Sequence, residues 1–291
     1  MKIAFLGFGE AARAFQESLA ALDHSLEFVA YDILLESSGT APAMQGEMEK
    51  RNVAVAADRT GLGDADRIFS AVTADQSLLA AQSLAQTLHT GQCFIDINSV
   101  SPERKRKTAA LVEATGASYL DMAVMAPVHP RGHRTPVLIA GPAAAALVTE
   151  LERLQFGYRI IGDEPGSATA IKMVRSLFVK GLEAITVEAL LAAKASGCFG
   201  EIYQSLSSSY PGLDWPDFAA YEFERTLHHG KRRAAEMHES AATLAELGLN
   251  GALATEIANV QQKMGGLAAP APQTGEMEDA VGKILAARLR T

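Results

Sequence analysis

The sequence predicts an α/β domain with a doubly wound, mainly parallel sheet, followed by a long interdomain helix and an all-helical C-terminal domain. Two observations predict this fold class. Short apolar runs alternate with helical stretches up to about residue 162, which is typical of a parallel sheet covered on both faces. Beyond the segment 162–166, strand signals stop and apolar residues recur at helical spacing. We therefore expect domains at residues 1–162 and 163–291.

The N-terminal elements follow from that alternation. We expect strands at residues 2–6, 27–31, 54–56, 67–70, 93–96, 118–123, 136–140 and 158–161. Helices between them are expected at 11–22, 74–88, 101–114 and 143–154. Ser101 before Pro102 is a strong helix start, because serine caps free N–H groups and proline fits the first helical position.

The C-terminal elements are expected to be helical throughout. One helix without internal proline covers 167–195, and shorter helices cover 200–208, 216–225, 231–247, 251–263 and 277–289. Gly230 either lies within a continuous helix or breaks it into two. The segment 265–275, rich in glycine, alanine and proline, is expected to be a loop.

The most specific motif is the run from Ile3 to Ala12, where an apolar strand leads into Gly-x-Gly-x-x-Ala and then into a helix. In a dinucleotide-binding βαβ unit, the first glycine makes the tight turn and the second lets backbone amides approach a pyrophosphate. The motif therefore predicts a Rossmann domain; the alternative is a tight strand–helix turn that binds nothing. The expected cofactor residues of this run are Gly7, Phe8, Gly9, Glu10, Ala11 and Ala12.

Asp32 follows the second expected strand at the spacing at which such domains bind the adenosine ribose. An acidic side chain there accepts hydrogen bonds from the ribose hydroxyls and repels a 2′-phosphate. Residues 32–38 contain no arginine or lysine, which favours NAD, although Ser37 and Ser38 keep NADP open. The alternative is that Asp32 caps a turn.

The composition excludes several functional classes. The net charge of -8 argues against a general nucleic-acid or anionic-membrane binder. No apolar stretch reaches the roughly 18 residues of a membrane span. Cys93 and Cys198 lack neighbouring metal-ligand residues, so we expect buried thiols and no metal. A strand at the very start leaves no room for a signal peptide, and we expect a cytoplasmic protein.

Lys172 lies near the start of the long expected helix, where a cation is slightly unfavourable beside the helix dipole. It shares a helix face with Arg175, Ser176, Val179 and Glu183. A face that mixes cationic, hydroxyl and apolar groups suits an interdomain cleft; the alternative is a solvated charged stripe.

Two basic clusters also suit a carboxylate or phosphate ligand. The first is a loop that contains His129, Arg131, His133 and Arg134. The second ends in Arg232 and Arg233. The alternatives are an ordinary exposed loop for the first cluster and a subunit contact for the second.

Three segments in order carry a resemblance to a known family. They are the glycine motif, Leu120-Asp121-x-Ala123-Val124, and Gly166 followed six residues later by Lys172. Together they resemble the β-hydroxyacid dehydrogenases, which include the 3-hydroxyisobutyrate and 6-phosphogluconate dehydrogenases. The stretch 172–184 is similar to a bacterial branch of 6-phosphogluconate dehydrogenase-like proteins with a distinctive helical C-terminal domain. The resemblance covers nearly the whole chain.

The resemblance implies a Rossmann domain, a helical domain, a homodimer and an active site between the domains. It implies a nicotinamide cofactor, with Lys172 as general acid/base on a substrate hydroxyl. Ser99 matches a hydroxyl position near the nicotinamide, and Val72, Thr73 and Asn98 match the segments that pass the cofactor.

The departures from the family pattern fall on substrate recognition. Met125, Ala126 and Pro127 stand where the family has Ser-Gly-Gly, and Ser176 replaces a substrate-contacting asparagine. We therefore expect a small anionic substrate other than 3-hydroxyisobutyrate or 6-phosphogluconate. The expected catalytic residues are Lys172, Ser99 and Ser176, and the expected substrate contacts are Met125, Ala126, His129, Arg131, Arg175 and Arg233.

The expected function is an NAD(P)-dependent dehydrogenase or reductase acting on CH–OH. An imine reductase-like enzyme is the first alternative, although such enzymes usually lack the lysine at position 172. A non-catalytic dinucleotide-binding protein is the second, because the substrate loop departs from the family pattern.

Overall fold

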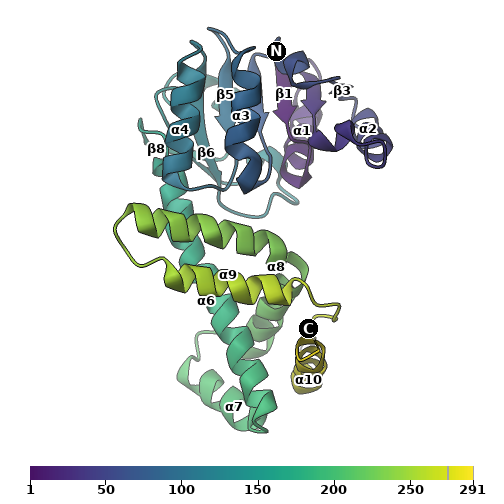
Figure 1. The fold of residues 1–291 in the computed structure, drawn as a ribbon, viewed down its shortest axis with the longest axis vertical. Coiled ribbons are helices and arrows are strands. Elements are labelled where there is room, and N and C mark those ends of the chain that lie inside the picture. Colours follow the sequence, from purple (N-terminus) through teal and green to yellow (C-terminus); the bar gives the residue numbers. More distant parts are fainter. Residues whose placement is uncertain (274, 291) are drawn as a thin grey trace. The chain divides into compact units, whose positions relative to one another are not determined.

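The computed structural model describes residues 1–273 and 275–290, and its contacts form two compact units that divide between Lys172 and Met173. In the part of the chain that is described, the first unit holds an eight-stranded sheet and the second unit is helical (Figure 1). The division falls inside one helix, α6 (Ser167–Ala195). The predicted fold class is confirmed. Thr274, in the loop expected at 265–275, and Thr291 lie outside the described residues.

The sheet has the strand order of a doubly wound dinucleotide-binding fold. Its strands are β1 (Lys2–Leu6), β2 (Glu27–Tyr31), β3 (Ala54–Val55), β4 (Arg67–Ser70), β5 (Cys93–Asp96), β6 (Ser118–Val124), β7 (Val137–Ala140) and β8 (Tyr158–Gly162). They lie in the order β3-β2-β1-β4-β5-β6-β7-β8, and each neighbouring pair is parallel except β6–β7. Strand order reverses beside β1, and ligands of such sheets bind at this switch point, outside the carboxyl ends of the strands.

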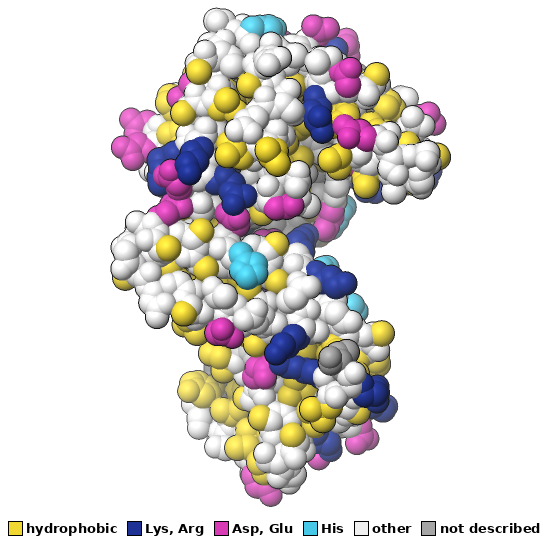
Figure 2. Space-filling view, in the orientation of Figure 1, with side chains coloured by type: hydrophobic (Ala, Val, Ile, Leu, Met, Phe, Trp, Pro, Cys, Tyr) yellow, Lys and Arg dark blue, Asp and Glu magenta, His cyan; other side chains and the backbone are white. Residues whose placement is uncertain are grey.

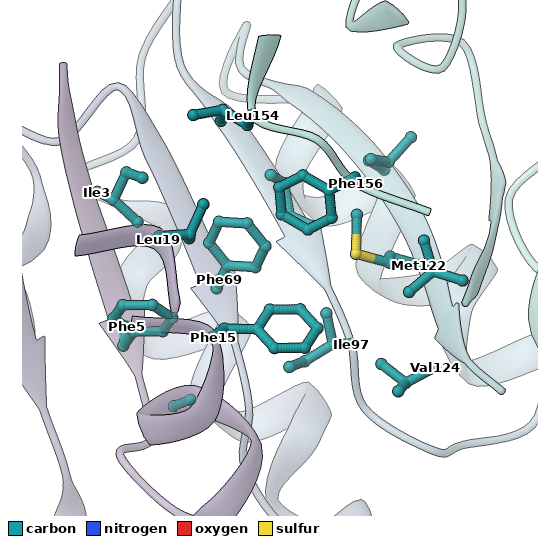
Figure 3. Packing of buried hydrophobic residues seen from close by; sticks show 14 of the residues in the cluster. Ile3, Phe5, Phe15, Leu19, Phe69, Ile97, Met122, Val124, Leu154 and Phe156 are labelled. Carbon is teal, nitrogen blue, oxygen red and sulfur yellow. The ribbon is translucent and has the colours of Figure 1, made fainter. Parts of the chain in front are cut away.

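Helices cover both faces of the sheet because each face is apolar. On one face, α1 (Glu10–Leu22), α2 (Ala41–Glu49) and α5 (Val148–Arg153) pack on a core that contains six phenylalanines. Figure 3 shows Phe15 of α1 beside Phe69 and Phe156, whose rings stack 6.3 Å apart. On the other face, α3 (Ser77–Ala85) and α4 (Pro102–Glu113) cover Phe94 and Tyr119.

The predicted strands agree with the structure to within one residue at each end. The expected start of α4 is also confirmed, because the Ser101 side chain accepts a hydrogen bond from the N–H of Arg104. Helix α2 was not predicted. It contains a proline and a glycine and buries only Met44 and Met48, so its apolar periodicity is weak.

The second unit is built from α6, α7 (Phe199–Ser209), α8 (Trp215–Glu246), α9 (Ala252–Met264) and α10 (Met277–Arg288). Helix α8 is continuous, so the break considered at Gly230 is wrong. A Cβ at Gly230 would lie 2.2 Å from the carbonyl oxygen of Gln261 and 2.6 Å from the backbone nitrogen of Gly265. The glycine lets α8 approach the end of α9; it does not interrupt the helix.

The surface carries charges of both signs. On the face shown in Figure 2, acidic and basic side chains are interspersed on both units. None of the helices described is long and apolar enough to cross a membrane.

Candidate active site

The glycine-rich loop between β1 and α1 forms a cradle for an anion. Gly7 adopts φ +88°, and a Cβ there would lie 2.6 Å from the carbonyl oxygen of Ala71, so only glycine fits. Gly9 caps α1, and no heavy atom lies within 4 Å of the point its Cβ would occupy. The first N–H groups of a helix lack intrahelical partners and attract anions. This geometry fits the pyrophosphate of a dinucleotide.

The other motif residues contribute mainly through the backbone. The side chains of Phe8 and Ala12 are buried in the core, where the Phe8 ring packs edge-on against Phe5. Ala11 is half-buried and Glu10, in the first turn of α1, is exposed. Phe8 and Ala12 can therefore contact a cofactor only through their backbone atoms.

Asp32 joins the glycine-rich loop to the end of β2. One carboxylate oxygen accepts the N–H of Phe8 at 2.8 Å, and the other accepts the N–H of Leu34 at 2.9 Å. Asp32 thus caps the 3₁₀ turn η1 (Ile33–Glu36), as one of the two sequence interpretations proposed. A carboxylate has about four acceptor positions, so these two bonds leave capacity for ribose hydroxyls.

Asn98 ties together the loops that follow β4 and β5. Its side-chain oxygen accepts the N–H of Val72 at 2.8 Å, and its amide nitrogen donates to Ser70 Oγ at 2.9 Å and to Asp96 Oδ1 at 2.8 Å. Thr73 follows, exposed, at the start of the 3₁₀ turn η3 (Ala74–Gln76). Asn98 is buried and positions these loops through its amide group.

Two predicted catalytic residues meet at the carboxyl edge of the sheet. Lys172 Nζ, in the second turn of α6, donates to Ser99 Oγ at 2.6 Å, although the two residues are 73 positions apart. Both side chains are partly buried. An ammonium and a hydroxyl in direct contact are the groups needed to bind a substrate oxygen and to move its proton.

A buried charge network lies beneath this pair. Lys105 Nζ donates to the carbonyl oxygen of Asp96 at 2.7 Å, and it lies 3.0 Å from Asp96 Oδ1 and 3.3 Å from Asp121 Oδ1. None of the three side chains has more than 1% of its surface exposed. Tyr119 donates its hydroxyl to Asp96 Oδ2 at 2.9 Å. Burial, and then the charges of the two aspartates, raise the pKa of Tyr119 well above its usual range.

The same network holds the start of α6. Asp121 Oδ2 accepts the N–H groups of Gly166 and Thr169, both at 3.1 Å. Thr169 in turn donates its hydroxyl to the carbonyl oxygen of Val100 at 2.8 Å. Burial raises the pKa of Asp121, and Lys105 opposes that rise. The helix that carries Lys172 is therefore fixed to the strand ends that carry Ser99.

Sequence reasoning missed Lys105 because it lies in the basic run 104–107, which is typical of a solvated helix face. The signal that could have found it is helical periodicity. The buried face of α4 consists of Pro102, Lys105, Thr108, Ala109 and Val112. A lysine in phase with that face needs buried acidic partners.

The predicted basic loop after β6 divides into exposed and buried parts. His129 and Arg131 are exposed, as a ligand contact requires, and Met125 and Ala126 are half-buried. His133 is buried: its ring nitrogens lie 2.7 Å from Ser18 Oγ and 2.8 Å from the carbonyl oxygen of Leu154. Burial lowers the pKa of His133. His133 therefore packs in the core and is not available as a ligand contact, unlike the exposed members of the basic loop.

In the helical unit, Arg233 has a different role from the predicted ligand contact. It forms a two-point ion pair with Glu183, through an Nε bond of 2.9 Å and a second bond from Nη2. Gln261 donates to the same carboxylate at 2.7 Å. Because Glu183 and Arg233 are both buried, the arginine neutralises an internal acid.

The remaining predicted residues of the helical unit lie on α6. Ser176 is buried and accepts a hydrogen bond from Lys180 Nζ at 3.1 Å, and Lys180 pairs with Glu236 at 2.7 Å. Arg175 is exposed. Among residues 1–273 and 275–290, no group of three histidine, cysteine or acidic side chains could hold a metal ion.

Two family models match the chain. The NAD binding domain of 6-phosphogluconate dehydrogenase matches residues 2–149, which is half of the sequence. A domain of unknown function, DUF1932, matches residues 193–264 in the helical unit.

Similar proteins cover almost the whole chain. A conserved hypothetical protein from Sinorhizobium meliloti 1021 is 32% identical and superposes with a TM-score of 0.77, covering 99% of this chain and 96% of that one. An uncharacterized 28.5 kDa protein of Methanothermus fervidus is 25% identical over 82% of this chain and 89% of its own length. The 3-hydroxyisobutyrate dehydrogenase of Mycobacterium tuberculosis shares the fold, with a TM-score of 0.72 at 17% identity over 97% of this chain and 98% of that one.

The family matches agree with the geometry of the first unit. The match to an NAD-binding domain begins at the strand before the glycine cradle and ends within α5. It supports a nicotinamide cofactor for the cradle formed by Gly7 and Gly9. The chain therefore belongs to the β-hydroxyacid dehydrogenase superfamily, in the branch that joins the NAD binding domain of 6-phosphogluconate dehydrogenase to a DUF1932 domain.

Proposed function

We propose that this protein is an NAD-dependent oxidoreductase that transfers hydride between the nicotinamide and a small anionic hydroxy compound, with Lys172 as general acid/base. The observation that carries the proposal is the 2.6 Å hydrogen bond from Lys172 Nζ to Ser99 Oγ at the carboxyl edge of the sheet. The cofactor, when bound, supplies or accepts the hydride.

Lys172 and Ser99 perform the proton chemistry in this proposal. For oxidation, the lysine amine takes the proton of the substrate hydroxyl while the carbon gives up its hydride, which leaves a carbonyl. For reduction, the ammonium returns that proton to the carbonyl oxygen. Ser99 orients the lysine and offers the substrate oxygen a second hydrogen-bond partner. A positioned acid/base of this kind contributes roughly 10²- to 10⁴-fold to a rate.

The choice of NAD rests on Asp32. Its carboxylate is fixed at the end of β2 by the N–H groups of Phe8 and Leu34, beside the glycine cradle. An acid held there can accept the ribose hydroxyls and repels a 2′-phosphate. Substrate recognition is assigned to the loop after β6, where the exposed guanidinium of Arg131 and the exposed imidazole of His129 can donate hydrogen bonds to a carboxylate or phosphate.

The proposal is tested with Lys172→Met, which keeps an unbranched side chain one atom shorter and removes the ammonium group. Turnover is measured with NAD(H) and NADP(H) on a panel of hydroxyacids and keto acids, the latter with and without an amine donor. We expect turnover to fall by at least about 100-fold while NADH binding is unchanged. Lys107→Met is the matched control, because Lys107 is 60% exposed, and it should leave both unchanged.

Three results would contradict the proposal. Undiminished turnover in Lys172→Met removes the lysine from the chemistry. Turnover only when an amine donor is present supports an imine reductase instead; a Streptomyces aurantiacus imine reductase shares this fold with a TM-score of 0.55 at 18% identity over 98% of this chain and 99% of that one. NADH binding without turnover on any compound supports a non-catalytic dinucleotide-binding protein.

A further inference from the structure

A cation that the sequence did not reveal, Arg59, lies over the ring of the residue that precedes Asp32. Arg59 begins the 3₁₀ turn η2 (Arg59–Leu62), which follows β3. Its guanidinium carbon lies 5.1 Å from the centre of the Tyr31 ring, and Tyr31 is the last residue of β2, directly before Asp32. Because β2 and β3 are parallel neighbours, their carboxyl ends lie at the same edge of the sheet. Arg59 therefore borders the place where the adenosine ribose is expected.

Glu36 holds this arginine. Its carboxylate oxygen Oε1 lies 3.3 Å from Arg59 Nη2, and the same oxygen accepts the hydroxyl of Tyr31. Burial and the hydrogen bond to Glu36 raise the pKa of Tyr31 to about 12, so the tyrosine remains a neutral donor. The side chains of Arg59 and Glu36 are 34% and 54% exposed, so a ligand can reach both.

We propose that Glu36 and Arg59 decide how the site treats the 2′ position of the adenosine ribose: Arg59 is the cation that can receive a 2′-phosphate, and Glu36 withholds it. The inference rests on the proposed function, because it concerns the cofactor of that site. Asp32 and Glu36 outweigh Arg59 by one negative charge, and a phosphate monoester adds about two more. With Arg59 engaged by Glu36, rejection of NADP depends on both acids and not on Asp32 alone.

The chemistry of arginine predicts which cofactor gains affinity when Glu36 is replaced. A guanidinium binds phosphate through two parallel N–H donors, but a carboxylate competes for those same donors. Replacing Glu36 with glutamine removes the competing charge and keeps the size of the side chain. The freed fork of Arg59 then gains charge-assisted hydrogen bonds to a 2′-phosphate, whereas NAD, which lacks that phosphate, gains nothing.

The experiment is isothermal titration of the full-length protein with NAD+ and with NADP+. We expect wild type to prefer NAD+. In Glu36→Gln the Kd for NADP+ should fall by about tenfold or more, and the Kd for NAD+ should change by less than about threefold. The double variant Glu36→Gln/Arg59→Met should lose the gain for NADP+. Glu36→Ala should change the NADP+ Kd in the same direction, so the test does not depend on one folded variant.

Asp23→Asn is the matched control, because it also removes one negative charge and frees an arginine. Asp23 follows α1 at the opposite end from the glycine cradle and accepts Arg153 at 2.8 Å. The Kd of the Asp23→Asn variant for NADP+ should equal that of wild type. An unchanged NADP+ Kd in Glu36→Gln, or a gain in NADP+ affinity that survives the loss of Arg59, overturns the inference. The proposed function stands in either case, provided that the proteins bind NAD+. Failure of wild type to bind either nucleotide overturns the proposed function itself, together with this inference.

Discussion

Lys105 is a lysine without exposed surface, and two carboxylates and a backbone carbonyl surround its ammonium group. An isolated charge in the interior costs several kcal/mol, so the lysine and its acids depend on one another. Asp96 also binds Asn98, and Asp121 binds the first N–H groups of α6. The network thereby fixes the relative positions of Ser99 and Lys172.

Replacing Lys105 with methionine should destabilise the protein strongly. The substitution leaves two buried carboxylates without their cation, and breaking a buried pair in this way costs about 3–5 kcal/mol. The free energy of unfolding, measured by urea denaturation at pH 7, should fall by that amount. Lys107→Met, on the exposed side of the same helix, should stay within about 0.5 kcal/mol of wild type. A Lys105→Met variant as stable as the Lys107→Met control would show that the network contributes nothing to folding.

At the scale of the element, α8 carries a buried acid without a full set of partners. Glu222 is 5% exposed, and its Oε2 has no hydrogen-bond partner. Burial, and then repulsion from Glu183, raise the pKa of Glu222 to about 7, against the attraction of Arg233 and Arg225. The folded protein therefore keeps a proton on Glu222 at pH values where the unfolded chain has lost it.

This raised pKa predicts a pH-dependent effect of Glu222→Gln. Between pH 4.5, the ordinary pKa of the group, and pH 7, the folded state binds more protons than the unfolded state, so the contribution of Glu222 to stability falls as pH rises. A glutamine at position 222 cannot ionise, so it does not contribute this pH dependence. The variant should match wild type near pH 5 and exceed its free energy of unfolding by about 2–3 kcal/mol at pH 8.

The measurement is chemical denaturation of both proteins at the two pH values. Glu201→Gln, an exposed position on α7, is the control and should show no pH-dependent difference. A difference between Glu222→Gln and wild type that is equal at pH 5 and pH 8 would rule out a raised pKa for Glu222.

Helix α6 presents an apolar row as well as its buried face. Val174, Phe178 and Ile185 are 51%, 69% and 64% exposed and recur at spacings of four and seven residues. Apolar residues at such spacing share one side of a helix. The family resemblance implies a homodimer, which stays a prediction, and this row is an apolar surface that a second copy of the chain would cover.

At the scale of the whole molecule, the sequence predicts regular elements well and their long-range contacts poorly. The strands agree because each is a short apolar run between glycines or polar turns. The expected boundary after residue 162 lies at the end of β8, whereas the compact units divide after Lys172, inside α6. No proline or glycine punctuates α6 at that point, so local sequence carries no signal for the division.

The candidate site shows the same contrast between local motifs, which the sequence predicts, and long-range contacts, which it does not. Gly7, Gly9, Asp32 and Lys172 are found from spacing, because a motif fixes the local backbone. Arg59 is not, because its contact with Glu36 joins residues that only the pairing of β2 with β3 brings together. Pairings of this kind depend on tertiary structure, which no window of the sequence contains.

The proposed cofactor site requires the open space in front of Gly9, and Gly9→Val tests this requirement most directly. A Cβ at Gly9 has no heavy atom within 4 Å apart from its chain neighbours, and the backbone conformation, φ −78°, suits any residue. The variant should therefore fold with a loss of about 1 kcal/mol from the poorer helix cap. It should nevertheless fail to bind NADH, because its methyl groups fill the space assigned to the pyrophosphate.

The measurement is a titration of NADH fluorescence, with thermal unfolding of the same samples as the check on folding. Gly46→Val, on α2 and also without atoms within 4 Å of its Cβ, is the matched control and should bind NADH like wild type. If Gly9 lines the pyrophosphate site, NADH binding is lost in Gly9→Val and retained in Gly46→Val, with both variants folded. A folded Gly9→Val protein that binds NADH with wild-type affinity would contradict that assignment.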